Sequence, residues 1–144
     1  IETVVQPKRI ILDRQGRLPL MAKILAQADT VLVMGPFRQE LADLGVLQLP
    51  VQPLKQLLSQ LAEQHQIYDV LVEAGATLST AFLQEQLVDE LISYVAPTLL
   101  GQSARTMFNA EFSLMAEQLR FKLRDVTRLG DDVRFRLIPF QETL

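Results

Sequence analysis

Short apolar runs, broken by polar residues, glycine or proline, recur along the first two thirds of the chain. Runs of this length are typical of strands covered on both faces, as in parallel sheets. Glycine and proline at their ends mark turns. We therefore predict strands over residues 9–13, 30–34, 45–50, 68–73 and 90–96, of which the run over 45–50 is the weakest.

Leucines at helical spacing predict the clearest helix of the chain, which opens at Pro53. Proline suits a first helical turn because its missing N–H is not needed there. A second helix is predicted from Thr77, acting as N-cap, to about Glu85, and a weaker one over residues 20–27. The inner positions are Leu54, Leu57, Leu58, Leu61 and Ala62 in the first helix and Leu78, Ala81 and Phe82 in the second.

Toward its end the chain alternates between apolar and basic residues. This period of two predicts an antiparallel hairpin over residues 119–124 and 133–137, with one dry and one wet face. Strands interleaved with helices, followed by a hairpin, predict an α/β fold with a mixed sheet in one compact unit. Six of the fourteen basic residues lie between Arg120 and Arg136. We assign them mainly to the wet face; the alternative is a partner surface.

Composition narrows the possible functions. The 144 residues include no cysteine, which excludes disulfides, thiolate metal sites and cysteine nucleophiles from this chain. His65 is the one histidine, so no metal site is predicted. A net charge of −3 argues against nucleic-acid binding, and no apolar stretch approaches a membrane span. Because the chain begins with Ile1, we expect it to be the back part of a longer protein.

The best candidate site lies where residues 70–79 pass from a predicted strand through Gly75 into a predicted helix. Backbone N–H groups, the helix dipole and the Thr77 and Ser79 hydroxyls can hold a phosphate there. Glycine allows the close approach, and residues 56–104 contain no Lys or Arg that could bind the phosphate instead. The alternative is an ordinary strand–glycine–helix connection without a ligand.

Two charged residues follow predicted strands. Glu73 directly precedes the turn at Gly75, and open α/β sheets bind ligands beyond the carboxyl ends of their strands. It therefore either reaches a substrate or is an exposed or helix-capping acid. Arg14 follows the first strand, where a guanidinium can bind the 2′-phosphate that distinguishes NADP from NAD. The alternative is a surface arginine without a ligand.

A resemblance to a known enzyme family centres on residues 71–101, LVEAGATLSTAFLQEQLVDELISYVAPTLLG. The chain resembles the reductase domain of the bifunctional riboflavin-biosynthesis deaminase–reductases. That family carries a Val-Glu-Gly/Ala-Gly turn, a Leu-Val-Asp-Glu-Leu helix end and an Ala-Pro-x-Leu-Leu-Gly stretch, matched here by residues 72–75, 87–91 and 96–101. The upstream PKRIILDRQGRLP and the basic hairpin are also similar. Ala74 departs from the Gly-Gly pair of many members.

The resemblance implies a fold like that of dihydrofolate reductase, α/β/α with a mixed, mostly parallel sheet and an antiparallel C-terminal hairpin. It implies NADPH-dependent reduction of a small molecule, 5-amino-6-(5-phosphoribosylamino)uracil, to the ribitylamino compound in the cytoplasm, and self-association through this domain. Glu73 would face the substrate, Arg14 would hold the 2′-phosphate, and no catalytic residue is assigned. The other cofactor phosphates would lie on Gly75, Ala76, Thr77, Leu78, Ser79, Thr80 and Ala81.

The resemblance also implies that residues 1–144 are the C-terminal portion of the reductase domain, without its first strand and without the zinc deaminase. We therefore expect no turnover by this chain alone. Two alternatives stay open. One is another dihydrofolate-reductase-like NADPH reductase with a different substrate, and the other is a non-catalytic fragment that binds the cofactor or serves in assembly.

Overall fold

The computed structural model describes residues 6–140, which divide into two compact units between Gln60 and Leu61. Unit 1 comprises β1 (Arg9–Leu12), η1 (Lys23–Thr30), β2 (Val31–Met34), α1 (Gln39–Asp43), β3 (Leu47–Leu49) and the first part of α2 (Leu54–His65). Unit 2 comprises the end of α2, α3 (Ala76–Gln84), β4 (Leu91–Val95), η2 (Met115–Glu117), β5 (Phe121–Leu129) and β6 (Asp132–Pro139).

Unit 1 is built on a three-stranded parallel sheet in the order β1-β2-β3. The central strand, Val-Leu-Val-Met, is between 0 and 3% exposed at every position, so both faces of β2 are covered. An uninterrupted apolar run is the sequence that such a strand requires. Because the strands are parallel, their carboxyl ends, which lead into Asp13, Gly35 and Pro50, lie at one edge of the sheet.

One face of this sheet packs in a continuous apolar core. Each fully buried aliphatic side chain there stabilises the unit by roughly 1.5–3 kcal/mol. On α2, Leu54 and Leu57 are buried as the helical stripe predicts. The buried members of the core are Leu25, Val31, Val33, Leu41 and Val46, and Ile11, Leu18, Ala22, Ile24 and Ala28 pack against them.

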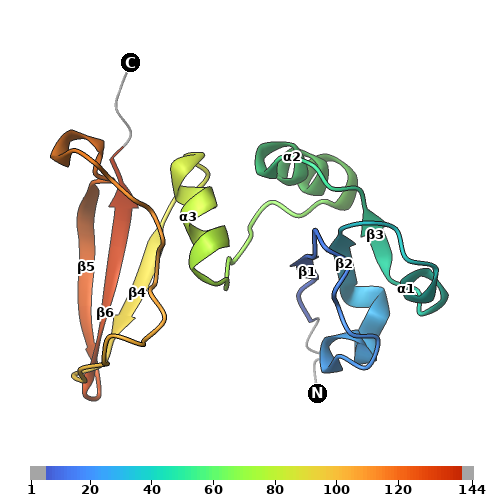
Figure 1. Ribbon diagram of the computed structural model, residues 1–144, viewed down its shortest axis with the longest axis horizontal. Coiled ribbons are helices and arrows are strands. Elements are labelled where there is room, and N and C mark those ends of the chain that lie inside the picture. The colour runs from blue at the N-terminus through green and yellow to red at the C-terminus, as the bar shows by residue number, and fades with distance from the viewer. Residues whose placement is uncertain (1–5, 141–144) are drawn as a thin grey trace. The chain divides into compact units, whose positions relative to one another are not determined.

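Unit 2 contains an antiparallel sheet in the order β4-β6-β5 (Figure 1). A two-residue turn, Gly130-Asp131, joins β5 to β6, and Gly130 takes a φ of +63°, a left-handed conformation that favours glycine. The register shifts between Leu123 and Asp125, so Arg124 is the extra residue of a β-bulge. The predicted hairpin is thereby confirmed and extended.

The predicted dry face of the hairpin is wrong in one respect. The register does place apolar residues opposite one another, Leu123 against Leu137 and Val126 against Phe135. However, none of these side chains is buried, and Leu123 is 54% exposed. In the part of unit 2 that the structure describes, no layer covers this face completely, so the apolar pattern produces a half-exposed surface.

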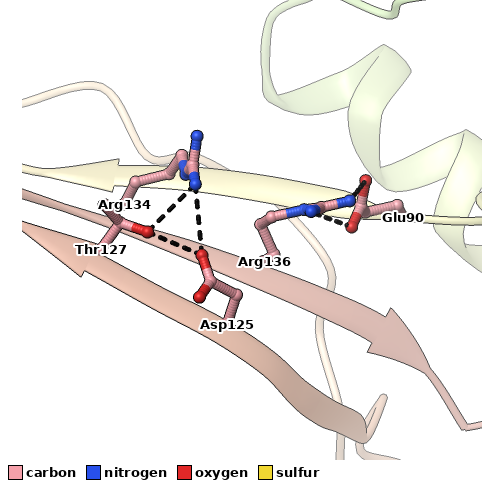
Figure 2. A network of polar contacts seen from close by, with 5 residues as sticks. All are labelled: Glu90, Asp125, Thr127, Arg134 and Arg136. Atoms are coloured by element: carbon pink, nitrogen blue, oxygen red, sulfur yellow. Dashed lines mark hydrogen bonds and ion pairs between the residues drawn. The ribbon is translucent and has the colours of Figure 1, made fainter.

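The opposite face of the same sheet carries a network of charged residues (Figure 2). Arg136 donates two hydrogen bonds to the Glu90 carboxylate, at 2.8 and 3.1 Å. Arg134 donates to Asp125 at 3.2 Å and to the Thr127 hydroxyl at 3.0 Å. These two arginines lie on the polar face, as the wet-face interpretation expects, and their charges are balanced within the sheet.

The network also fixes the ionisation of its acids. The hydrogen bond from Arg136 holds the pKa of Glu90 below its ordinary value. Hydrogen bonds from Thr127 and then Arg134 lower the pKa of Asp125 in the same way. Both acids are therefore charged at neutral pH and remain paired with the arginines.

Three further sequence predictions require correction. Residues 68–73 form no strand; they run as an exposed, irregular segment between α2 and α3 (Figure 1), because no described strand pairs with them. Thr77 is not the N-cap, since α3 begins at Ala76 and Gly75 occupies the N-cap position. The helix expected over 20–27 is the 3-10 segment η1, interrupted at Gln27. The remaining predicted strands and the Pro53 helix are confirmed, with ends shifted by a few residues.

Candidate functional site

The first part of the candidate site is the turn that follows β1 at the carboxyl edge of the parallel sheet. Arg14 is exposed in this turn, and within residues 6–140 its guanidinium makes no hydrogen bond or ion pair. Gly16, with a φ of +63°, donates its N–H to the Asp13 carbonyl at 3.1 Å and closes the turn. A free cation is thereby presented just beyond a strand end, where ligands of α/β sheets bind.

Hydrogen bonds from the side chains of Asp13 and Arg38 hold the turn after β1 in place. The Asp13 carboxylate accepts the backbone N–H groups of Arg17 and Leu18, at 2.9 and 2.7 Å. The guanidinium of Arg38 donates to the carbonyls of Gly16 and Leu18, at 3.2 and 2.6 Å. Partial burial raises the pKa of Asp13, but the two N–H donors and the charges of Arg17 and Arg38 outweigh it, so this pKa lies below its ordinary value. Asp13 and Arg38 therefore position the turn.

The second part of the candidate site is the start of α3. Gly75 has φ −73° and ψ 171°, and no side chain caps the helix. The first helical hydrogen bond runs from the Ser79 N–H to the Gly75 carbonyl, at 3.1 Å. The N–H groups of Ala76, Thr77 and Leu78 consequently have no intrahelical acceptor. A Cβ added to Gly75 would meet nothing within 4 Å, so space is open beside these donors.

The hydroxyls of α3 differ in their surroundings. Thr77 Oγ1 accepts from the Asn109 side chain at 3.2 Å, and Ser79 Oγ donates to the Ala74 carbonyl at 3.3 Å. Thr80 is 5% exposed and its hydroxyl accepts the Asn109 N–H at 3.0 Å. The first two hydroxyls lie in the accessible first turn, whereas Thr80 anchors the segment around Asn109 to the helix.

Glu73 lies two residues before Gly75 in the irregular segment that precedes α3. It is exposed, and within the described range its carboxylate makes no hydrogen bond or ion pair. The predicted residues are thus brought together in part: Glu73 and the run 75–81 adjoin one another in unit 2, while Arg14 belongs to unit 1.

Sequence reasoning missed several residues at the carboxyl edge of unit 1. Arg17 is exposed, and within residues 6–140 its guanidinium makes no hydrogen bond or ion pair, although its charge acts on the Asp13 carboxylate. Gly35 lies against the end of β1, so closely that an added Cβ would be 2.4 Å from the Asp13 carbonyl oxygen. The Gly-Pro pair after the second strand is the sequence signal that marks this close approach.

Neither a membrane-spanning helix nor a cluster of metal ligands is found among residues 6–140. No helix between residues 6 and 140 has the length and hydrophobicity to cross a membrane. Over the same residues, no three histidine or acidic side chains converge as metal ligands do.

Solved structures define the class of this domain. The chain is similar to a pyrimidine reductase-like protein from Corynebacterium diphtheriae, with a TM-score of 0.77 and 17% identity over 94% of this chain and 62% of that one. Identity this low shows the fold alone, and the fold is the α/β type of the pyrimidine reductases, which is dihydrofolate-reductase-like. The predicted fold class is confirmed, although the described strands form two sheets where one mixed sheet was expected.

Sequence comparison then identifies the family. The chain belongs to the RibD C-terminal domain family, whose model matches residues 2–135. It is similar to RibD from Acinetobacter baumannii, with 74% identity and a TM-score of 0.93 over 98% of this chain and 40% of that one. It is also 39% identical, over 53% of its length and 37% of the relative, to a 5-amino-6-(5-phosphoribosylamino)uracil reductase from Buchnera aphidicola. The first curated relatives are matched over 38% of their own length.

Proposed function

We propose that this chain forms the cofactor-binding part of a reductase that uses NADPH to convert 5-amino-6-(5-phosphoribosylamino)uracil to its ribitylamino product. Membership of the RibD C-terminal domain family supports the reaction class, and the Buchnera relative carries that activity in its name. The single observation that carries the cofactor assignment is the start of α3, where three free N–H groups adjoin open space beside Gly75.

The residues of α3 fit a dinucleotide phosphate. Free N–H groups and the positive end of the helix dipole bind anions without a lysine, and residues 56–104 contain neither Lys nor Arg. In this proposal the run Gly75–Ala81 holds the cofactor phosphates, with the N–H groups of Ala76, Thr77 and Leu78 as the donors. When bound, NADPH supplies the hydride that reduces C1′ of the sugar, in its ring-opened imine form, to a CH₂ group.

The remaining assignments follow from charge and exposure. Arg14 binds the 2′-phosphate, since its guanidinium is exposed and unpaired within residues 6–140. Glu73, exposed and next to the phosphate turn, faces the substrate. The imine nitrogen takes up one proton as C1′ receives the hydride, and no residue of this chain is assigned as its donor. The proposal also includes self-association through this domain and a cytoplasmic location.

The experiment is a cofactor titration of the protein, in the full form that its gene encodes, with NADPH and NADH followed by nicotinamide fluorescence. Arg14→Ala is expected to weaken NADPH binding about tenfold and to leave NADH binding unchanged, because one charge-assisted contact is lost. Gly75→Ala is expected to weaken both cofactors, because its Cβ enters the space beside the donors. Gly101→Ala is the matched control, since a Cβ there also meets nothing within 4 Å.

Turnover of the ribosylaminouracil with NADPH is measured on the same samples. Equal affinity for NADPH and NADH, before and after the Arg14 substitution, would refute the 2′-phosphate role. Unchanged affinity in Gly75→Ala would remove the phosphate site from the start of α3.

A further inference from the structure

Asn109, in the irregular connection between β4 and η2, contacts two threonines of α3. Its backbone N–H donates to the Thr80 hydroxyl at 3.0 Å, and its side-chain Nδ2 donates to the Thr77 hydroxyl at 3.2 Å. Because Thr77 and Thr80 are three residues apart, their side chains lie on the same face of the helix. One residue, 29 and 32 positions farther along the chain, is thus held against both hydroxyls.

These two hydrogen bonds differ in their exposure to water. Thr80 is 5% exposed, so its hydrogen bond is shielded and fixes the position of the Asn109 backbone. Thr77 and Asn109 are themselves exposed. A hydrogen bond between two exposed side chains contributes little to folding, because water satisfies either group nearly as well. The backbone of Asn109 is therefore an anchor of the fold, whereas its side-chain amide is not.

The amide of Asn109 determines what the Thr77 hydroxyl can do. A hydroxyl has one donor hydrogen and two acceptor lone pairs. Here a lone pair accepts from Asn109, and within residues 6–140 the hydroxyl hydrogen has no acceptor. Accepting a hydrogen bond polarises the hydroxyl and strengthens its donation to a further acceptor. Because Thr77 is the second residue of α3, this hydroxyl lies beside the free N–H groups of the first turn.

We infer that Asn109 is a positioning residue for the cofactor phosphates, which holds the Thr77 hydroxyl as a hydrogen-bond donor to a phosphate oxygen. The inference rests on the proposed function for the identity of the ligand and adds to it a contribution from outside the run Gly75–Ala81. Asn109 acts through Thr77. A phosphate oxygen is a charged acceptor, so the hydrogen bond from Thr77 is stronger than one to a neutral group.

The test is a double-mutant cycle on the protein, in the full form that its gene encodes, with NADPH binding measured by calorimetry. Thr77→Val removes the hydroxyl, keeps the branched shape of the side chain, and is expected to weaken NADPH binding about tenfold. Asn109→Ala is expected to weaken it about threefold, and to add nothing when it is combined with Thr77→Val. Gln102→Ala is the matched control, since Gln102 is an exposed amide in the same connection and makes no hydrogen bond within residues 6–140.

Two further measurements detect a merely structural effect of Asn109→Ala. Adenosine 2′-monophosphate has no pyrophosphate, so its affinity is expected to be the same for this variant and for the unchanged protein. The midpoint of urea unfolding is also expected to stay the same, because the hydrogen bond from the backbone N–H to Thr80 is kept.

The outcomes separate the role of Asn109 from the proposed function. If the unchanged protein and Asn109→Ala bind NADPH equally well, the positioning role is overturned and the proposed cofactor stands. If Asn109→Ala weakens NADPH by the same factor with and without Thr77→Val, Asn109 does not act through Thr77 and the inference is wrong. If it weakens adenosine 2′-monophosphate as much as NADPH, its effect is structural and the positioning role is again overturned. If the unchanged protein binds no NADPH, the proposed function and the inference are both wrong.

Discussion

Gly35→Ala tests the close contact that joins the first two strands at the carboxyl edge of unit 1. The added Cβ would lie 2.4 Å from the Asp13 carbonyl oxygen and 3.3 Å from its carbonyl carbon. Neither backbone segment can yield freely, because Asp13 N–H donates to the Met34 carbonyl at 2.9 Å and Gly35 N–H to the Leu49 carbonyl at 3.0 Å. The substitution must therefore spread β1 and β2 at this point.

The expected loss follows from these contacts. Overpacking costs about 1–3 kcal/mol, and weakening one strand-end hydrogen bond costs about 1 kcal/mol more. Alanine also restricts the unfolded chain more than glycine does, which raises the free energy of unfolding by about 0.5 kcal/mol. We therefore expect Gly35→Ala to lower the free energy of unfolding by about 2.5 kcal/mol.

Urea unfolding followed by far-UV circular dichroism measures this difference. With a urea m-value of about 1.5 kcal/mol/M, the midpoint is expected to fall by roughly 1.7 M. Gly101→Ala is the matched control, because its Cβ meets nothing within 4 Å while the unfolded chain gains the same restriction. If the two variants unfold at the same urea concentration, the close contact between Gly35 and Asp13 is not present in the folded protein.

The other predictions concern a helix end and a paired acid. Gln66 follows α2 with a φ of +56°, a left-handed conformation that favours glycine. Gln66→Gly is therefore expected to raise the free energy of unfolding by about 0.5–1 kcal/mol in urea. Glu63→Gly, inside α2, is the control and should lower it by about 1 kcal/mol. The hydrogen bond from Arg136 lowers the pKa of Glu90, so its pairing stabilises the fold above the unfolded pKa and is lost as pH falls through the folded pKa. The stability gap between the unchanged chain and Glu90→Gln should be largest above about pH 5 and close toward pH 3; a gap that widens in acid would contradict the pairing.

The apolar pattern predicted the central strand of unit 1 correctly because the burial of that strand is nearly complete. The run Val31–Met34 has no polar residue, and the structure buries all four side chains. The stripe on α2 is likewise decisive, since only a helix places Leu54 and Leu57 on one face. Pattern was less informative for η1, where a 3-10 segment replaces the expected α-helix and is interrupted at Gln27, because short helical runs depend on tertiary contacts.

Within the candidate site, features with a local sequence signal were predictable, and features that depend on contacts between distant residues were not. Arg14 and the Gly75 turn could be found from the sequence because strand ends and glycine turns are local signals. The positioning of the Arg14 turn could not, since it depends on Arg38 reaching carbonyls 20 and 22 residues away. The need for glycine at position 35 depends in the same way on a backbone atom of Asp13, 22 residues earlier in the sequence.

The strand predicted over residues 68–73 does not form, which shows that strand propensity alone is not sufficient without a pairing partner. Val70, Leu71 and Val72 have strong strand propensity, yet Leu71 is 80% exposed and the segment is irregular. Strand propensities span only about 1 kcal/mol, whereas fixing the backbone costs about 1–2 kcal/mol per residue. Propensity therefore does not offset ordering without a hydrogen-bonded neighbour. Phe121–Leu129 forms a strand because a two-residue turn brings β6 alongside it. No described strand pairs with residues 68–73. Strand prediction in this chain therefore succeeds or fails with the pairing partner rather than with the apolar run itself.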